Sequence, residues 1–145
     1  MQTIFYIILS IFMGIMVSVY LPLNSSVSKH LGSPITANVS FFLVALLVSV
    51  SIFAFFGDYK TIFNVKNVPI YLYLTGVGAA LMILGTTFLI PKIGARMFFI
   101  LVIAGQIIMA MIISHFGWLE SPKDMITFKK IIGAVLLLAG AVISV

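Results

Sequence analysis

The chain has 145 residues, of which 63% are hydrophobic and only 8% are charged. Soluble domains carry about 25% charged residues, so this chain could not cover a soluble fold with polar groups. The composition therefore excludes the water-soluble classes and predicts a membrane protein that is embedded in the lipid bilayer.

The net charge of +5 does not indicate a nucleic-acid partner. The basic residues fall between apolar runs, where phospholipid headgroups and membrane topology account for them. The chain contains no cysteine, which excludes disulfides, thiolate catalysis and cysteine-based metal sites.

Five apolar runs are each long enough to cross a hydrocarbon core about 30 Å thick, which takes roughly 20 helical residues. They cover about 3–22, 35–56, 69–90, 96–116 and 129–145. The runs are too long for barrel strands and lack the alternation of such strands. We therefore predict an all-α integral membrane protein, with five transmembrane helices in a single domain, 1–145.

The first run opens with MQTIFYIILS, which has no basic segment and no small-residue cleavage site. It is expected to be an uncleaved span, not a signal peptide. The helix can continue past Pro22 to about His30. Tyr20, Asn24 and Ser28 recur every four residues and therefore share one face.

The other polar residues within the spans are also neutral. Asn38 lies in the second run, Thr86 and Thr87 lie in the third, and Gln106 lies in the fourth. Two interpretations stay open: interhelical hydrogen bonds worth about 0.6–2 kcal/mol each, or the polar lining of a cavity. The candidate residues for such a substrate cavity are Tyr20, Asn24, Asn38 and Gln106.

The fourth run includes LVIAGQIIMAMIISHFGW, residues 101–118. A glutamine at membrane depth needs a hydrogen-bond partner, and the glycine beside Gln106 would let another helix approach. His115 and Trp118 mark where this helix meets the headgroups, with the tryptophan as an anchor. Arg96, at the other end of the run, is also expected at the interface.

Small residues predict where helices pack closely. Gly14 lies between Ser10 and Ser18 in a small-xxx-small series on the first run. Gly133 and Gly140 lie seven residues apart on the last run. Such stripes indicate helix contacts, either within one chain or between the two chains of a dimer.

The positions of the acidic residues are informative, because none of them lies within an apolar run. Asp58, Glu120 and Asp124 are the only acids, and all three lie in connections. Without a carboxylate at membrane depth, exchange of organic cations for protons is disfavoured. No metal-ligand cluster and no nucleophile paired with a base are evident, so we expect no enzyme activity, no metal and no cofactor.

The lysines and arginines give a weak topology signal. Five of them lie on the side of the amino terminus, and three lie on the opposite side (Lys29, Lys92 and Arg96). This small bias favours an amino terminus inside the cell. A fixed orientation and insertion in both orientations are about equally supported by charge alone.

Four short motifs occur along the chain: LGSP at 31–34, PKIGA at 91–95, AGQ at 104–106 and HFGW at 115–118. In these motifs the chain resembles the YdcZ-type proteins, which are five-helix, half-size members of the drug/metabolite transporter superfamily. The resemblance covers nearly the whole chain. It implies that superfamily's helical bundle and a multi-pass location in the inner (plasma) membrane of a bacterium.

The chain departs from this family at positions that could contact a substrate. Tyr20 stands where the family often has glutamine, and Ser114 stands where it commonly has an acid. Val44 or Ala45 replaces a glycine of the second helix. These departures from the resembled family imply a more lipophilic or neutral ligand.

Larger members of the superfamily contain ten helices as two inverted halves, so the resemblance implies that a five-helix chain pairs with a second copy. We expect an antiparallel homodimer that moves an unknown small molecule by alternating access. The alternatives are a small membrane channel with downhill flux and an accessory subunit of a heteromeric membrane complex.

Overall fold

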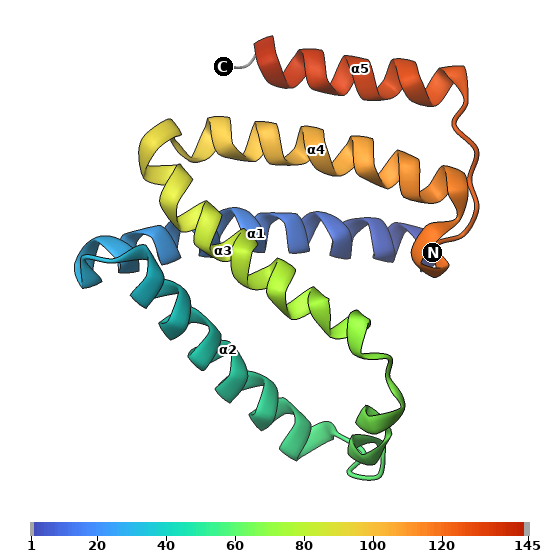
Figure 1. Ribbon diagram of the computed structural model, residues 1–145. Helices are drawn as coiled ribbons and strands as arrows, with labels where there is room; N and C mark the ends of the chain where they lie inside the picture. The colour runs from blue at the N-terminus through green and yellow to red at the C-terminus, as the bar shows by residue number, and fades with distance from the viewer. Residues whose placement is uncertain (1, 144–145) are drawn as a thin grey trace. The chain divides into compact units, whose positions relative to one another are not determined.

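The computed structural model describes residues 2–143, and this part of the chain contains only helices and connections (Figure 1). The observed class is the predicted all-α class. The chain divides into two compact units, Met1–Lys92 and Ile93–Val145. Each unit has its own packed helices.

The first helix, α1 (Gln2–Leu31), is uninterrupted over 30 residues and contains Pro22. It extends beyond the predicted first span and includes the continuation past Pro22. A proline inside a helix removes one backbone hydrogen bond. The residues after it are nevertheless held in place by packing, because Asn24, Ser25 and Ser28 are buried.

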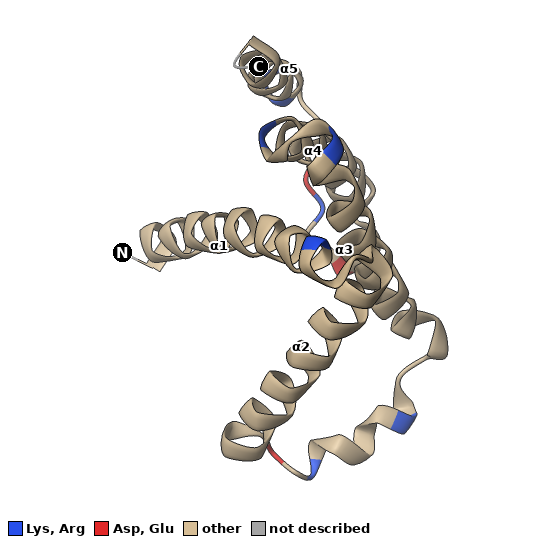
Figure 2. Cartoon of the chain, turned by 90° about the vertical axis from the view of Figure 1, so that its left-hand side faces the viewer, with Lys and Arg blue, Asp and Glu red and all other residues tan. Residues whose placement is uncertain are grey.

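A tight turn joins α1 to α2 (Pro34–Phe56). Gly32 has a φ of 69°, in the left-handed region that favours glycine. The Ser33 hydroxyl then caps α2 by accepting a hydrogen bond from the Thr36 N–H at 3.3 Å, and the proline after it suits the first helical position. The two helices diverge from this turn, as both views show (Figures 1 and 2).

The third helix, α3 (Leu74–Ile93), completes the first unit. The buried side chains of the three helices are Leu21, Asn24, Ser25, Ser28, Ala37, Ile83, Thr86, Thr87 and Ile90. Five of these nine are polar, whereas most large apolar side chains of the unit are exposed. This distribution suits helices whose outer faces contact lipid.

Two short 3-10 helices, η1 (Thr61–Asn67) and η2 (Ile70–Tyr73), connect α2 to α3. The sequence predicted a connection at the position of η1, but it placed the residues of η2 in the third span, 69–90. The Tyr73 hydroxyl donates to the Val65 carbonyl at 3.0 Å and so ties η2 to η1. At the other end, a hydrogen bond from the hydroxyl of Tyr59 to the last turns of α2 holds the start of the connection.

The second unit contains α4 (Ala95–Phe116), the short η3 (Trp118–Glu120) and α5 (Phe128–Ile143), which packs against α4. Gly94 and Gly117 flank α4, and both have a positive φ, of 79° and 66°. Glycine is the residue that adopts this conformation without strain, so the two glycines define where α4 begins and ends.

Four helices of the described chain are long and apolar enough to cross a membrane: Gln2–Leu31, Pro34–Phe56, Ile70–Ile93 and Ala95–Phe116. The described part of α5 has 16 residues, which span about 24 Å. The predicted last span, 129–145, ends outside the described residues. The fifth crossing therefore stays a prediction.

Candidate functional site

A groove of about 440 Å³ lies between α1 and α2 in the first unit. Its lining residues are Tyr20, Leu23, Asn24 and Val27 of α1 and Ser40, Phe41, Val44 and Ala45 of α2. On each helix these positions recur every three or four residues, so that one face of each helix forms a wall. The groove brings together Tyr20 and Asn24, two of the four residues that the sequence predicts for a cavity.

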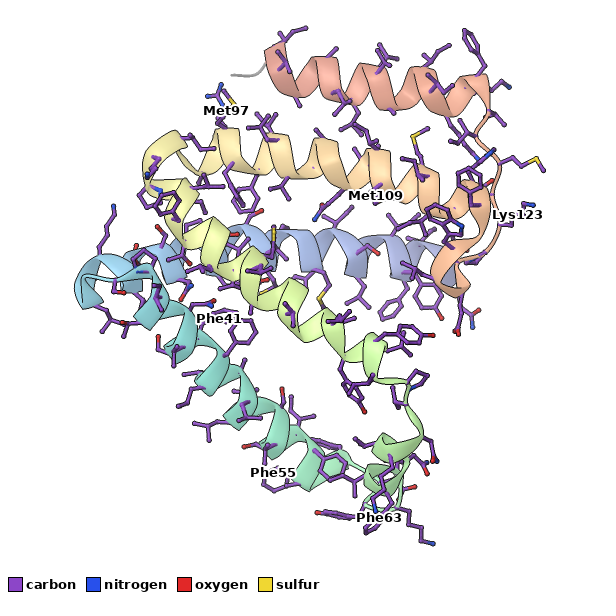
Figure 3. All side chains as sticks on the ribbon, in the orientation of Figure 1. Phe41, Phe55, Phe63, Met97, Met109 and Lys123 are labelled. Carbon is purple, nitrogen blue, oxygen red and sulfur yellow. The ribbon has the colours of Figure 1, made fainter. Side chains whose placement is uncertain are left out.

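The groove has an aromatic part. Tyr20 stacks on Phe41, with ring centroids 5.8 Å apart and an interplanar angle of 30°; Phe41 is labelled in Figure 3. The Tyr20 hydroxyl has no hydrogen-bond partner among residues 2–143. The pair therefore presents flat apolar faces and one uncommitted hydroxyl group.

Asn24 supplies a polar group whose orientation is fixed. The hydroxyl of Thr87 donates to the Ile83 carbonyl at 2.8 Å, so its oxygen can only accept from Asn24, which lies 2.8 Å away. The contact therefore places the Asn24 amide nitrogen, Nδ2, against Thr87. Asn24 Oδ1 accepts no hydrogen bond from the described residues. Asn24 thus brings an oriented acceptor to the lining of the groove, in addition to the hydroxyl of Ser40, which donates to the Ala37 carbonyl at 2.9 Å.

The other two predicted cavity residues lie elsewhere. Asn38 is not a lining residue of the groove, and its Oδ1 is buried without a hydrogen-bond partner among the described residues. Gln106 lies on α4, in the second unit, where its side chain is exposed and makes no hydrogen bond with residues 2–143. The assignment of these two residues to a substrate cavity stays a prediction.

The groove includes residues that the sequence did not single out for a cavity, above all Phe41 and Ser40. A signal for them exists, because Ala37, Ser40, Phe41, Val44 and Ala45 follow helical spacing along one face of α2. That face was hard to recognise in the sequence, because nearly every other position of α2 is also apolar. Val44 and Ala45, one of which was expected to replace a glycine of the resembled family, both line the groove.

The end of α4 is held by side chains that the sequence predicts at the membrane interface. The Nδ1 atom of His115 accepts a hydrogen bond from the Ile126 N–H at 3.1 Å. That nitrogen is therefore unprotonated, and in the neutral ring Nε2 carries the hydrogen. Trp118 stacks on Phe116, with ring centroids 5.0 Å apart. Arg96 lies in the first turn of α4, and the position of these residues relative to the bilayer stays a prediction.

A smaller pocket of about 250 Å³ lies beside the connection from α4 to α5. Lys130 forms an ion pair with Asp124, and its Nζ donates to the Met125 carbonyl at 2.8 Å. These contacts hold the connection against the start of α5. Within residues 2–143, no group of three or more His, Asp or Glu side chains could hold a metal.

The glycines predicted to pack helices have open space around them. A Cβ added at Gly14, Gly133 or Gly140 would have no atom within 4 Å, apart from its own helix and chain neighbours. Within their own units, none of the three lies against another helix. The predicted contacts at these glycines stay a prediction.

Comparison with known proteins gives one finding. The family model described as "Putative inner membrane exporter, YdcZ" matches residues 5–143, nearly the whole chain. No curated protein and no solved structure matches. The family match includes both structural units and every residue of the groove.

Proposed function

The chain belongs to the YdcZ family of inner membrane exporters, and on this premise we propose that it exports an uncharged small molecule that binds in the groove between α1 and α2. It is a multi-pass protein of the inner membrane, with several helices that can cross it. Membership of this family supports a role in transport and not in catalysis. The groove supplies the chemistry that selects the molecule.

The observation that carries this proposal is the free Oδ1 of Asn24 in a largely apolar groove. A carbonyl oxygen of fixed orientation recognises a hydrogen-bond donor of the substrate. The stacked rings of Tyr20 and Phe41 suit an aromatic or other flat apolar body. No acid is among the lining residues, so a cation would enter the groove without a counter-charge.

Transport proceeds by alternating access in an antiparallel homodimer. Two features support this arrangement. The groove is walled by only two helices, so a second copy could cover its open side. The small-residue positions Gly14, Gly133 and Gly140 have room for another helix at close approach.

A counterflow assay tests the proposed function with the purified protein in liposomes. Chloramphenicol is a suitable probe, since it is uncharged and aromatic and carries hydroxyl and amide donors. Liposomes preloaded with the unlabelled compound should take up the labelled compound faster than protein-free liposomes. Tetraphenylphosphonium, a cation without a donor, should show no such exchange. Exchange of the cation alone would contradict the assignment of an uncharged substrate.

The antiparallel arrangement predicts that the chain inserts in both orientations. The chain has no cysteine, so Met125→Cys places a single thiol at an exposed position of the connection before α5. In intact cells a membrane-impermeant maleimide should label about half of the molecules, and permeabilised cells should show labelling of the rest. Labelling of all molecules, or of none, before permeabilisation rules out the antiparallel homodimer.

A further inference from the structure

The connection between α2 and α3 contains a helix with three distinct edges. The helix η1 (Thr61–Asn67) is a 3-10 helix of seven residues, longer than most of its kind. A 3-10 helix has three residues per turn, so side chains at positions i and i+3 lie directly above one another. The sequence TIFNVKN therefore forms three straight rows of side chains.

The three rows differ in chemistry. Thr61, Asn64 and Asn67 form a polar row. Ile62 and Val65 form an apolar row, which Val68 continues just after the helix. Phe63 and Lys66 form the third row, which begins with Lys60 just before the helix. The helix is thus amphipathic, with a repeat of three residues: one row is polar, one is apolar, and the third contains the basic and aromatic side chains.

Every side chain of this helix is exposed in the part of the chain that the structure describes. Ile62 is 52% exposed, Val65 is 53% exposed and Phe63 is 72% exposed. Figure 3 shows Phe63 standing out from the connection. In a water-exposed loop such a continuous apolar row would be unfavourable, so the row favours a nonpolar environment.

The side chains of the two lysines at this helix, Lys60 just before it and Lys66 within it, have no partner among residues 2–143. Neither Lys60 nor Lys66 forms an ion pair or a side-chain hydrogen bond with the described residues. The nearby acid, Asp58, uses Oδ1 to accept the backbone N–H of Lys60 at 3.0 Å. Figure 2 shows the basic residues in blue along this connection. The positive charges are therefore free to bind an external anion.

The position of the helix along the chain limits what that anion can be. It lies between α2 and the segment Ile70–Ile93, both of which can cross the membrane. Tyr73 ties η1 to the start of that segment, and Tyr59 ties the start of the connection to Ala54 of α2 at 2.7 Å. These bonds keep η1 close to the membrane surface, where tyrosine and lysine side chains are favoured.

We propose that η1 lies flat in the headgroup region of the membrane and binds acidic phospholipid. Ile62 and Val65 enter the upper acyl chains, and the row containing Asn64 faces water. Lys60 and Lys66 reach the lipid phosphates from the edge between these two environments. The inference does not depend on what the protein transports, and it assigns a lipid-binding role to a segment outside the substrate groove.

The orientation of the helix can be tested with tryptophan as a probe in the full-length protein. The only native tryptophan is first removed by Trp118→Phe. In vesicles that contain phosphatidylglycerol, Ile62→Trp should be quenched by bromine on the lipid acyl chains and protected from aqueous iodide. Asn64→Trp, two residues away, should show the opposite pattern. Equal iodide quenching at both positions would overturn the proposal.

The lipid preference can be tested with spin-labelled lipids at the protein boundary. Phosphatidylglycerol should associate more strongly than phosphatidylcholine, and Lys60→Gln with Lys66→Gln should remove most of this difference. The expected loss is about fivefold per lysine, the equivalent of about 1 kcal/mol. A matched pair, Lys29→Gln with Lys123→Gln, removes the same charge from the last turn of α1 and from the connection before α5 and should have a smaller effect.

Two results would overturn the lipid assignment. One is an equal loss of phosphatidylglycerol preference in both lysine pairs, which would indicate a general charge effect. The other concerns the Ile62→Trp variant. In this result the tryptophan is protected from iodide only at high protein density, and the brominated lipids do not quench it. That second result would show that another copy of the chain covers the apolar row in place of lipid.

Discussion

Replacing Asn24 with alanine should weaken binding of the uncharged probe about tenfold, the equivalent of about 1.4 kcal/mol, and should lower counterflow to a similar extent. The change removes Oδ1, an oriented acceptor of the groove, so that the donor of the bound molecule loses its partner. Stability should change little, because the lost bond to Thr87 is of a kind that averages about 0.6 kcal/mol in membranes. Equilibrium binding and the melting temperature measure the two effects separately.

Thr87→Val is the matched control for this prediction. It removes the other member of the same hydrogen bond but leaves Asn24 in the groove. The buried amide nitrogen of Asn24 then loses its acceptor, so the melting temperature should fall further than in Asn24→Ala. Binding should fall less, because Oδ1 is still present. If both variants bind like the unmodified protein and only melt earlier, the role of Asn24 is packing and the groove assignment is wrong.

Ala37→Leu should destabilise the first unit by about 1–3 kcal/mol. Ala37 is completely buried, at 0% exposure, close to the turn where α1 and α2 converge. A leucine has no room at such a position, so α2 must shift away from its neighbours. The shift should also separate Tyr20 from Phe41 and disrupt the groove. A lower melting temperature together with lost probe binding is the expected result.

Ala45→Leu provides the contrast on the same helix. Ala45 lines the groove and is only half-buried, so the larger side chain can extend into the open groove. Binding should weaken while the melting temperature stays close to that of the unmodified protein. An unchanged melting temperature in Ala37→Leu would show that α1 and α2 do not approach closely there.

Part of this site follows from local sequence rules. The four-residue spacing of Tyr20 and Asn24 predicts a common face, and both residues line one groove. The continuation of the first helix past Pro22 follows from the same spacing. These predictions succeed because they depend on helix geometry, which relates residues only a few positions apart.

The remainder depends on contacts that no local pattern encodes. The partner of Asn24 is Thr87, 63 residues further along the chain, and a sequence with many neutral polar residues does not show which of them pair. The helix η1 does not follow from the sequence pattern for another reason. Its rows of side chains repeat every three residues, whereas the apolar positions of an amphipathic α-helix repeat every 3.6 residues.

Pro22 has a mechanical consequence for the groove. It cannot donate to the carbonyl of Ser18, so the backbone of α1 is one hydrogen bond short at this turn. Bending there breaks no existing bond, which lowers the elastic resistance of the helix at that point. Tyr20 precedes the proline by two residues and Asn24 follows it by two. A small bend therefore changes the distance between Tyr20 and Asn24. In the proposed transport cycle, such a bend would weaken the contacts with a bound molecule without separating the helices.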